Sequence, residues 1–201
     1  MRVNVKKDGE NKSYTIIDSW EDVTLEKWAA LIAKTKKAKG KAAEAIASIT
    51  SLSSLPADLL RELSLNDVAK LMNKLADIQS RANSELKNKI VVEGETYGFM
   101  PDLSSITIGE YADLEHCIGE GLQDNLHKVM AILYRPITKA KDHWYDIEPY
   151  NIETKKVREQ IFKKMPAETV EAALVFFWTF VSVLLPSFQW YLTDKLKAVT
   201  S

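Results

Sequence analysis

The sequence predicts a mainly α-helical α+β fold in which two small β-hairpins each precede a set of helices. Three features predict it: two hairpin-type turns, apolar residues at three- and four-residue spacing over much of the chain, and a weak internal repeat. The 201 residues carry a net charge of −1 and are 46% hydrophobic, which argues against disorder. This length allows one domain or two small ones.

Two parts of the chain repeat each other at a constant offset. The pairs that lie 83 residues apart (97 − 14) include Tyr14 with Tyr97, Thr24 with Thr107 and Trp28 with Tyr111. The joint agreement of turn, aromatic residue, cap and helix register favours a duplicated unit over chance. We therefore expect a first hairpin-plus-helices unit over residues 1–88. A second one over 89–201 includes a long apolar C-terminal helix, and both units can still pack as one compact domain.

Each unit begins with a predicted β-hairpin. Val3 and Val5 alternate with polar residues, as in a half-buried strand. Asp8-Gly9 and Glu93-Gly94 are turn signals, because a type I′ turn needs positive φ at both central residues. A two-stranded ribbon alone is marginal in water, so each hairpin is expected to lie on helices or to pair with the other.

Helices are predicted after each hairpin. Thr24 and Thr107 can each cap a helix N-terminus, since a hydroxyl accepts an orphan backbone N–H, and Glu110 completes a capping box with Thr107. The other predicted helices cover about 41–51, a short stretch from Pro56, a longer one from Ser64 or Asn66, 125–133 and 154–164. Pro136 is expected to stop the fourth of these, and residues 137–151 are predicted to be irregular.

The most apolar stretch, residues 172–192, contains no charged residue. Its length is enough to span a bilayer, so a membrane anchor or pore-former is one reading. Polar residues from Glu168 and Glu171 onward recur at three- and four-residue steps, which favours an amphipathic helix packed on the core. A partner-binding helix is the third reading. Pro166 is predicted in the first turn of this helix.

Chemical motifs are sparse in this sequence. It contains no P-loop, no dinucleotide-binding glycine pattern, no G-x-S-x-G elbow and no H-E-x-x-H. His116 and Cys117 are adjacent on a predicted helix and point about 100° apart, so they cannot easily share a metal ion. One cysteine excludes an intrachain disulfide framework and indicates a reducing compartment. We expect no enzymatic activity, no cofactor and no metal.

The lysines between residues 34 and 41 form the clearest charge run. Of these, Lys36, Lys37 and Lys39 are candidate contacts for phosphate or for an acidic partner. The alternative is a solvated helix end, where cations favour the C-terminal dipole and Gly40 ends the helix. The near-zero net charge argues against a protein that coats nucleic acid.

An aromatic group follows in the predicted irregular segment. Trp144, Tyr145 and Tyr150 are candidate partner-binding residues, since aromatic side chains in a loop are typical of docking patches. The alternative is that they fill the core beside the second helix pair.

Several stretches resemble small proteins of tailed bacteriophages. The resemblance rests on short patterns over most of the chain, namely residues 20–24, 52–65, 107–114 and 125–137, Met165-Pro166 and Phe176-Phe177. It implies a non-enzymatic role in virion morphogenesis, most often tail or baseplate assembly, including chaperones of hub and tape-measure proteins. It carries no catalytic positions over to this chain.

The resemblance leaves two functions open. In the first, the chain is an assembly factor that binds other phage structural proteins in the host cytoplasm and leaves the mature particle. In the second, it is a stoichiometric virion component, such as a head–tail connector or ring subunit, and forms a homo-oligomer through strand edges. A membrane protein acting through residues 172–192 is a weaker alternative. No specific nucleic-acid partner is expected.

Overall fold

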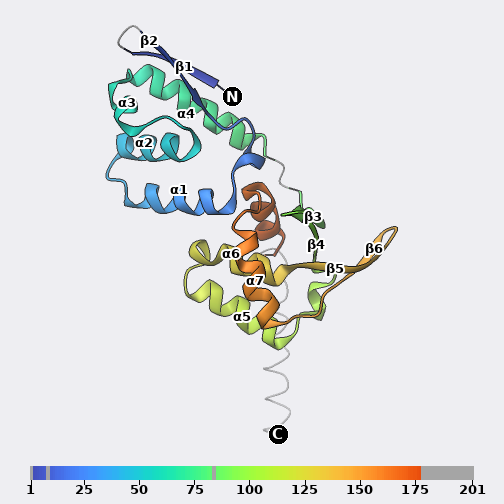
Figure 1. The fold of residues 1–201 in the computed structure, drawn as a ribbon. Coiled ribbons are helices and arrows are strands. Elements are labelled where there is room, and N and C mark those ends of the chain that lie inside the picture. Colours follow the sequence, from blue (N-terminus) through green and yellow to red (C-terminus); the bar gives the residue numbers. More distant parts are fainter. Residues whose placement is uncertain (1, 8–9, 83–84, 178–201) are drawn as a thin grey trace.

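The structure is a computed structural model that describes residues 2–7, 10–82 and 85–177. Two lobes follow each other along the chain (Figure 1). The first lobe runs through β1 (Arg2–Lys7), β2 (Glu10–Thr15), the 3-10 helix η1 (Trp20–Asp22), α1 (Leu25–Lys37), α2 (Lys41–Leu52), α3 (Ala57–Glu62) and α4 (Leu65–Ser80). The second runs through β3 (Lys89–Val92), β4 (Glu95–Phe99), η2 (Leu103–Ser105), α5 (Ile108–Gly119), α6 (Leu122–Leu133), β5 (Tyr134–Lys141), β6 (Trp144–Ile147), α7 (Ile152–Phe162) and helical residues 167–177.

This architecture is mainly helical α+β, as the sequence predicts. The predicted caps are confirmed: the Thr24 hydroxyl accepts from the Lys27 N–H, and Thr107 forms the capping box with Glu110. The turn between β3 and β4 is also confirmed, because Glu93 and Gly94 both have positive φ. The predicted turn at Asp8-Gly9 lies outside the described residues.

The sheet is larger than the sequence predicts. Residues 134–141 and 144–147 form strands, so the prediction of an irregular segment over 137–151 is wrong for most of its length. The antiparallel order is β3-β4-β5-β6, while β1 and β2 form a separate two-stranded ribbon. The reason is that β4 presents an edge: Tyr97 pairs with Pro136 and Phe99 with Tyr134. The helix α6 ends at Leu133, before Pro136, and Pro136 is itself part of β5, where its carbonyl accepts from the Glu148 N–H at 2.8 Å.

Two hydrophobic cores lie behind this arrangement. The first lobe packs around Ile49 and Leu52, and the second around Tyr97, Val129 and Phe162. Segments cross between them: Leu25, from α1, belongs to the second core, and Ala167, from the C-terminal helix, belongs to the first.

A short backbone pairing joins the lobes. The Leu25 N–H donates to the Met165 carbonyl at 2.7 Å, and the Ala167 N–H donates to the Val23 carbonyl at 2.8 Å. Each lobe therefore depends on residues from the other half of the sequence. The predicted boundary between residues 88 and 89 remains a prediction.

The start of the C-terminal helix differs from its predicted pattern. The first two residues of the expected stripe face the protein here, because Glu168 is buried beside Lys87 (Nζ to Oε1 3.5 Å) and Glu171 accepts from the Trp20 indole N–H at 3.2 Å. Val175, the next member of that stripe, is exposed, and so is the neighbouring Phe176. Within the described residues, no helix has both the length and the apolar character to cross a bilayer. Most of the 172–192 segment lies beyond them.

Candidate functional site

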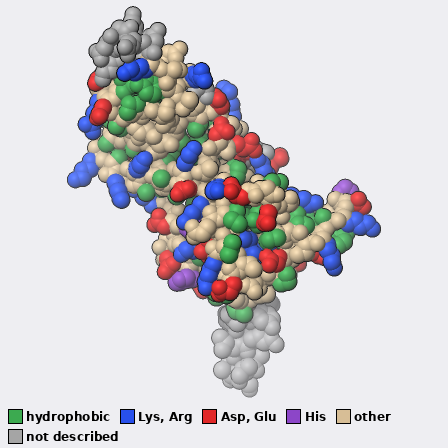
Figure 2. Space-filling model, in the orientation of Figure 1, with side chains coloured by type: hydrophobic (Ala, Val, Ile, Leu, Met, Phe, Trp, Pro, Cys, Tyr) green, Lys and Arg blue, Asp and Glu red, His purple; other side chains and the backbone are tan. Residues whose placement is uncertain are grey.

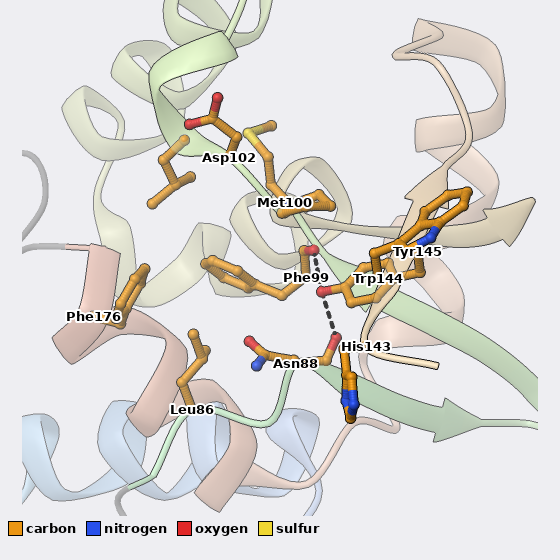
Figure 3. A pocket seen from close by; sticks show the side chains of 11 residues that line it. Leu86, Asn88, Phe99, Met100, Asp102, His143, Trp144, Tyr145 and Phe176 are labelled. Carbon is orange, nitrogen blue, oxygen red and sulfur yellow. Dashed lines mark hydrogen bonds between the residues drawn. The ribbon is translucent and has the colours of Figure 1, made fainter. Parts of the chain in front are cut away.

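A groove with apolar and aromatic walls lies beside the tip of the β5–β6 hairpin (Figure 3). Its volume is about 380 Å³. We call it the hairpin groove; it is lined by Leu86, Asn88, Phe99, Met100, Pro101, Asp102, Leu103, His143, Trp144, Tyr145 and Phe176. These residues come from the segment before β3, the end of β4, η2, the hairpin tip and the C-terminal helix. The site therefore forms only when distant parts of the second lobe come together.

Tyr145 fixes the hairpin onto the rest of the sheet. Its hydroxyl lies 2.7 Å from the Phe99 carbonyl and 3.0 Å from the Asn88 carbonyl, and it can donate to either (Figure 3). The Lys89 ammonium lies 5.2 Å from the ring centroid, a cation–π distance. Burial raises the pKa of this phenol, so the hydroxyl keeps the proton that it donates.

Gly98 makes this docking possible. A Cβ at Gly98 would lie 2.3 Å from Cε2 of Tyr145 and 3.0 Å from Cγ2 of Ile147. The Tyr145 ring therefore lies directly against the β4 backbone. A glycine inside a predicted strand is a known signal of such close approach, and it is the sequence feature that points to this contact.

Trp144 and Phe176 give the groove its exposed aromatic surface. They retain 51% and 45% of their accessible area, respectively, and Figure 3 places Trp144 on one side of the groove and Phe176 on the other. The Phe176 ring packs edge-on against Phe99, with centroids 5.7 Å apart. Grouped exposed apolar residues of this kind mark interaction surfaces more often than scattered ones do.

Tyr150 does not belong to the groove. Its hydroxyl donates to the Asp113 carboxylate, which also binds the Lys155 ammonium at 3.0 Å. The hydrogen bond from Tyr150 is the main cause of the lowered pKa of Asp113. The structure thus separates the predicted aromatic group: Trp144 lies at the edge of the groove, Tyr145 anchors the hairpin, and Tyr150 packs against the second core.

One buried ion pair and one partly buried ion pair support the base of the hairpin. Arg135 Nη2 lies 3.0 Å from Glu110 Oε1, and Arg158 Nη1 lies 2.8 Å from Glu148 Oε2. The Arg158 Nε also donates to the Ala131 carbonyl at 3.3 Å. These contacts connect α5, α6 and α7 to the two ends of the β5–β6 hairpin. They therefore fix the position of the hairpin, and with it one wall of the groove, relative to the helices.

The candidate lysines lie elsewhere in the molecule. Lys36 bonds to the side-chain oxygen of Gln123, while Lys37 and Lys39 are exposed at the end of α1. In Figure 1, α1 and the β5–β6 hairpin lie on opposite sides of the molecule. Positive and negative side chains are interspersed over the face shown in Figure 2. The lysines and the groove therefore do not form one site.

Residues with metal-binding or nucleophilic chemistry are dispersed. Among the described residues, no group of three or more His, Cys, Asp or Glu side chains is placed to hold a metal ion. Cys117 is buried, and burial raises the pKa of its thiol. Burial also lowers the pKa of His127, which favours its neutral form.

The families, curated proteins and solved structures compared with this chain include no match. The resemblance to small phage proteins thus stays a prediction from the sequence. Sequence reasoning found Trp144 and Tyr145 but missed the other walls of the groove. Phe176 lies in the apolar stretch that is predicted to pack on the core, yet it is half exposed and packs with Phe99 of β4.

Proposed function

We propose that this chain is a non-enzymatic protein-binding factor of phage tail or baseplate assembly and that it binds its partner through the hairpin groove. The carrying observation is the pair of half-exposed aromatic residues, Trp144 and Phe176, on either side of a groove that is lined by both apolar and polar groups. Aromatic anchors beside a concave apolar surface dominate many protein interfaces. The phage setting comes from the sequence resemblance alone.

The groove suits an inserted apolar side chain. Leu86, Phe99 and Met100 supply apolar contacts, while Asn88 and His143 supply polar groups at the margin. A few polar groups around an apolar surface are typical of sites that fix the orientation of what they bind. The partner would then be a phage structural protein that presents an apolar side chain during assembly.

Affinity capture from infected cells tests this function. The tagged chain, Trp144→Ala and the control Leu65→Ala are purified in parallel. Leu65 suits the control because it is 88% exposed and lies on α4 in the other lobe. We expect a tail or baseplate protein with wild type and Leu65→Ala, and its loss with Trp144→Ala. Retention of every captured protein by Trp144→Ala would rule out the groove as the binding site.

A second candidate function is a virion component assembled by strand pairing. It is favoured by the positions of β3 and β6 at the two edges of the four-stranded sheet, since unpaired edges invite strands from neighbouring chains. Sedimentation at high protein concentration separates the two candidates. A ring or connector subunit should form a closed oligomer, whereas the assembly factor should remain small without its partner.

A further inference from the structure

Strand β3 forms an open edge of the four-stranded sheet. It pairs with β4 alone, at one end of the order β3-β4-β5-β6 (Figure 1). The Phe99 N–H donates to the Asn88 carbonyl at 2.8 Å, and bonded pairs alternate along an antiparallel ladder. The backbone groups of Lys89 and Val91 therefore point away from β4, and no other described segment supplies a backbone partner for them.

The two edges of the sheet differ in how well they are protected. At the far edge, β6 pairs with β5 through a register shift between Ile137 and Lys139, and a bulge of this kind turns a strand edge away from further pairing. In contrast, β3 pairs in an unbroken register, and Val91 near its centre is 67% exposed. A regular edge with an exposed β-branched residue invites another strand.

The sequence of β3 and its turn is complementary to itself in antiparallel pairing. When Val91 lies opposite Val91 of a second copy, Lys89 of each chain lies opposite Glu93 of the other, because both are two residues from Val91. Opposite charges directly across two strands attract, whereas like charges repel. In the same register Ile90 lies opposite Val92, and both are buried in β3, so the buried faces of the two sheets lie on the same side.

Both charges are available for this contact. Among the described residues, Lys89 has no carboxylate partner, and its ammonium lies 5.2 Å from the centroid of the Tyr145 ring. Glu93 binds the Lys164 ammonium at 2.7 Å, and both of these side chains are more than half exposed. Exposed ion pairs contribute little to stability. Glu93 can therefore exchange this partner for Lys89 of another chain at small cost.

We propose that two copies of this chain pair antiparallel through β3, with Val91 opposite Val91, and join their four-stranded sheets into one. Each copy uses the same edge, so the contact closes on itself and leaves no β3 edge for a third chain. The dimer therefore differs from a ring or connector. The inference goes beyond the proposed function, because it depends on neither the hairpin groove nor the phage setting.

Cysteine crosslinking tests the register directly. Val91→Cys is placed in a Cys117→Ala background, which removes the native buried thiol, and is oxidised with copper phenanthroline. Opposed residues of a bonded pair have Cα atoms about 5.5 Å apart, within the range of a disulfide, so we expect rapid formation of a linked dimer.

Thr96→Cys in the same background is the matched control. Thr96 is exposed and faces Val91 from β4. In the proposed dimer the two Thr96 residues lie three strand spacings apart, about 14 Å, which is too far for a disulfide. We therefore expect little or no linked dimer from this variant.

Charge variants give a second test, by sedimentation without a crosslink. Lys89→Glu and Glu93→Lys each place like charges opposite one another at both ends of the contact, so each should raise the dimer Kd at least about tenfold. The double variant restores opposite charges and should restore the wild-type Kd. Lys70→Glu, at an exposed position on α4, should leave the Kd unchanged.

Four results would overturn the proposal. The first is a wild-type chain that sediments as a monomer up to its solubility limit. The second is equal crosslinking at positions 91 and 96, and the third is a double charge variant as monomeric as the single ones. The fourth is a disulfide from Val91→Cys to a different protein of infected cells without the homodimer, because β3 would then bind a partner strand. None of these results changes what Trp144→Ala captures, so the proposed function is tested separately.

Discussion

The two lobes share one order of elements but bury equivalent positions differently. In each, an antiparallel hairpin is followed by a 3-10 turn, a threonine-capped helix and a second helix. Leu25 and Ile108 both open the capped helix, yet Leu25 is 2% exposed and Ile108 is 79% exposed. Leu25 is covered where its own N–H donates to the Met165 carbonyl and the Glu26 N–H donates to the Lys163 carbonyl.

The hairpins of the two lobes also differ in how far other strands extend them. The β1–β2 ribbon stays two-stranded, whereas β3–β4 is extended by β5 and β6 into a sheet that carries the groove. Local sequence therefore specifies the hairpin, the cap and the helix in both lobes. Contacts with segments distant in the sequence determine which residues of these elements are buried and which are exposed.

The largest expected difference between the lobes concerns ion pairs. Arg135 and Glu110 form a buried pair in the second lobe, whereas Lys70 and Asp67 form an exposed one in the first. Arg135→Met should destabilise the protein by about 3–5 kcal/mol, because it leaves a buried carboxylate without its partner. Lys70→Met should leave the urea midpoint unchanged, since exposed pairs contribute little.

A double variant sharpens this test. Glu110→Gln removes the charge but keeps an oxygen for the capping bond with Thr107. Combined with Arg135→Met, it should restore much of the lost stability, because removal of both charges relieves the desolvation cost. A double variant as unstable as Arg135→Met alone would show that packing, not charge, is responsible.

The next prediction compares equivalent positions of the two repeated units, the first residues of the two capped helices. Leu25→Ala should cost about 2–5 kcal/mol as a buried truncation, while Ile108→Ala should stay within about 0.5 kcal/mol as a surface change. Urea unfolding of both variants measures the difference. Equal costs would mean that the two capped helices are covered alike, contrary to their exposed fractions.

A smaller effect is expected where the hairpin docks on the sheet. Gly98→Ala places a Cβ against the Tyr145 ring, and such overpacking typically costs about 1–3 kcal/mol. Faster hydrogen exchange confined to β5 and β6 would locate the damage in the hairpin. Gly109→Ala is the matched control in α5: its Cβ would meet open space, so the change should raise stability by about 0.5–1 kcal/mol.

The smallest effects are opposite pH dependences at two carboxyl groups. At the lobe junction, burial raises the pKa of Glu171, so its ionisation lowers native stability as pH rises above the ordinary value of 4.5. In the second lobe, the Tyr150 hydrogen bond lowers the pKa of Asp113, so its contribution is present at neutral pH and is lost as pH falls through the lowered value.

Two substitutions test these opposite pH dependences of stability. Glu171→Gln keeps an acceptor for Trp20 and should be more stable than wild type at neutral pH, with the gain vanishing in acid. Asp113→Asn should be less stable than wild type at neutral pH, and this gap should close in acid. Denaturation curves between pH 7 and about pH 3 measure both, and a gap of the same sign for the two variants would contradict the assigned causes.

The sequence predicts the local elements well because short-range signals encode them. Thr24, Thr107 and the Glu93-Gly94 turn each act within a few residues, and each lies where its pattern places it. The strand at Tyr134–Lys141 is not predicted from the sequence, because Pro136 is read as a helix stop. Nothing in the sequence near Pro136 indicates that this segment pairs with the edge of β4. Pairing across such a distance leaves no local pattern.

The candidate site was predictable only in part. Trp144 was found from its aromatic neighbours, whereas Tyr150 was grouped with it by closeness in sequence and is separated from it by the fold. The predicted solvent exposure of Glu168 was wrong because Lys87 and the lobe junction cover it. These errors share a cause, since each depends on a segment more than 30 residues away, as the Tyr150–Asp113 bond does with a separation of 37.

The most direct measurement is quantitative mass spectrometry of purified phage particles beside lysate of infected cells. The proposed assembly factor should be abundant in the lysate and missing from the finished particles, together with a co-purifying tail or baseplate protein. A fixed copy number of this chain in every particle would contradict that proposal, and the edges of its four-stranded sheet would then be the first place to look for subunit contacts.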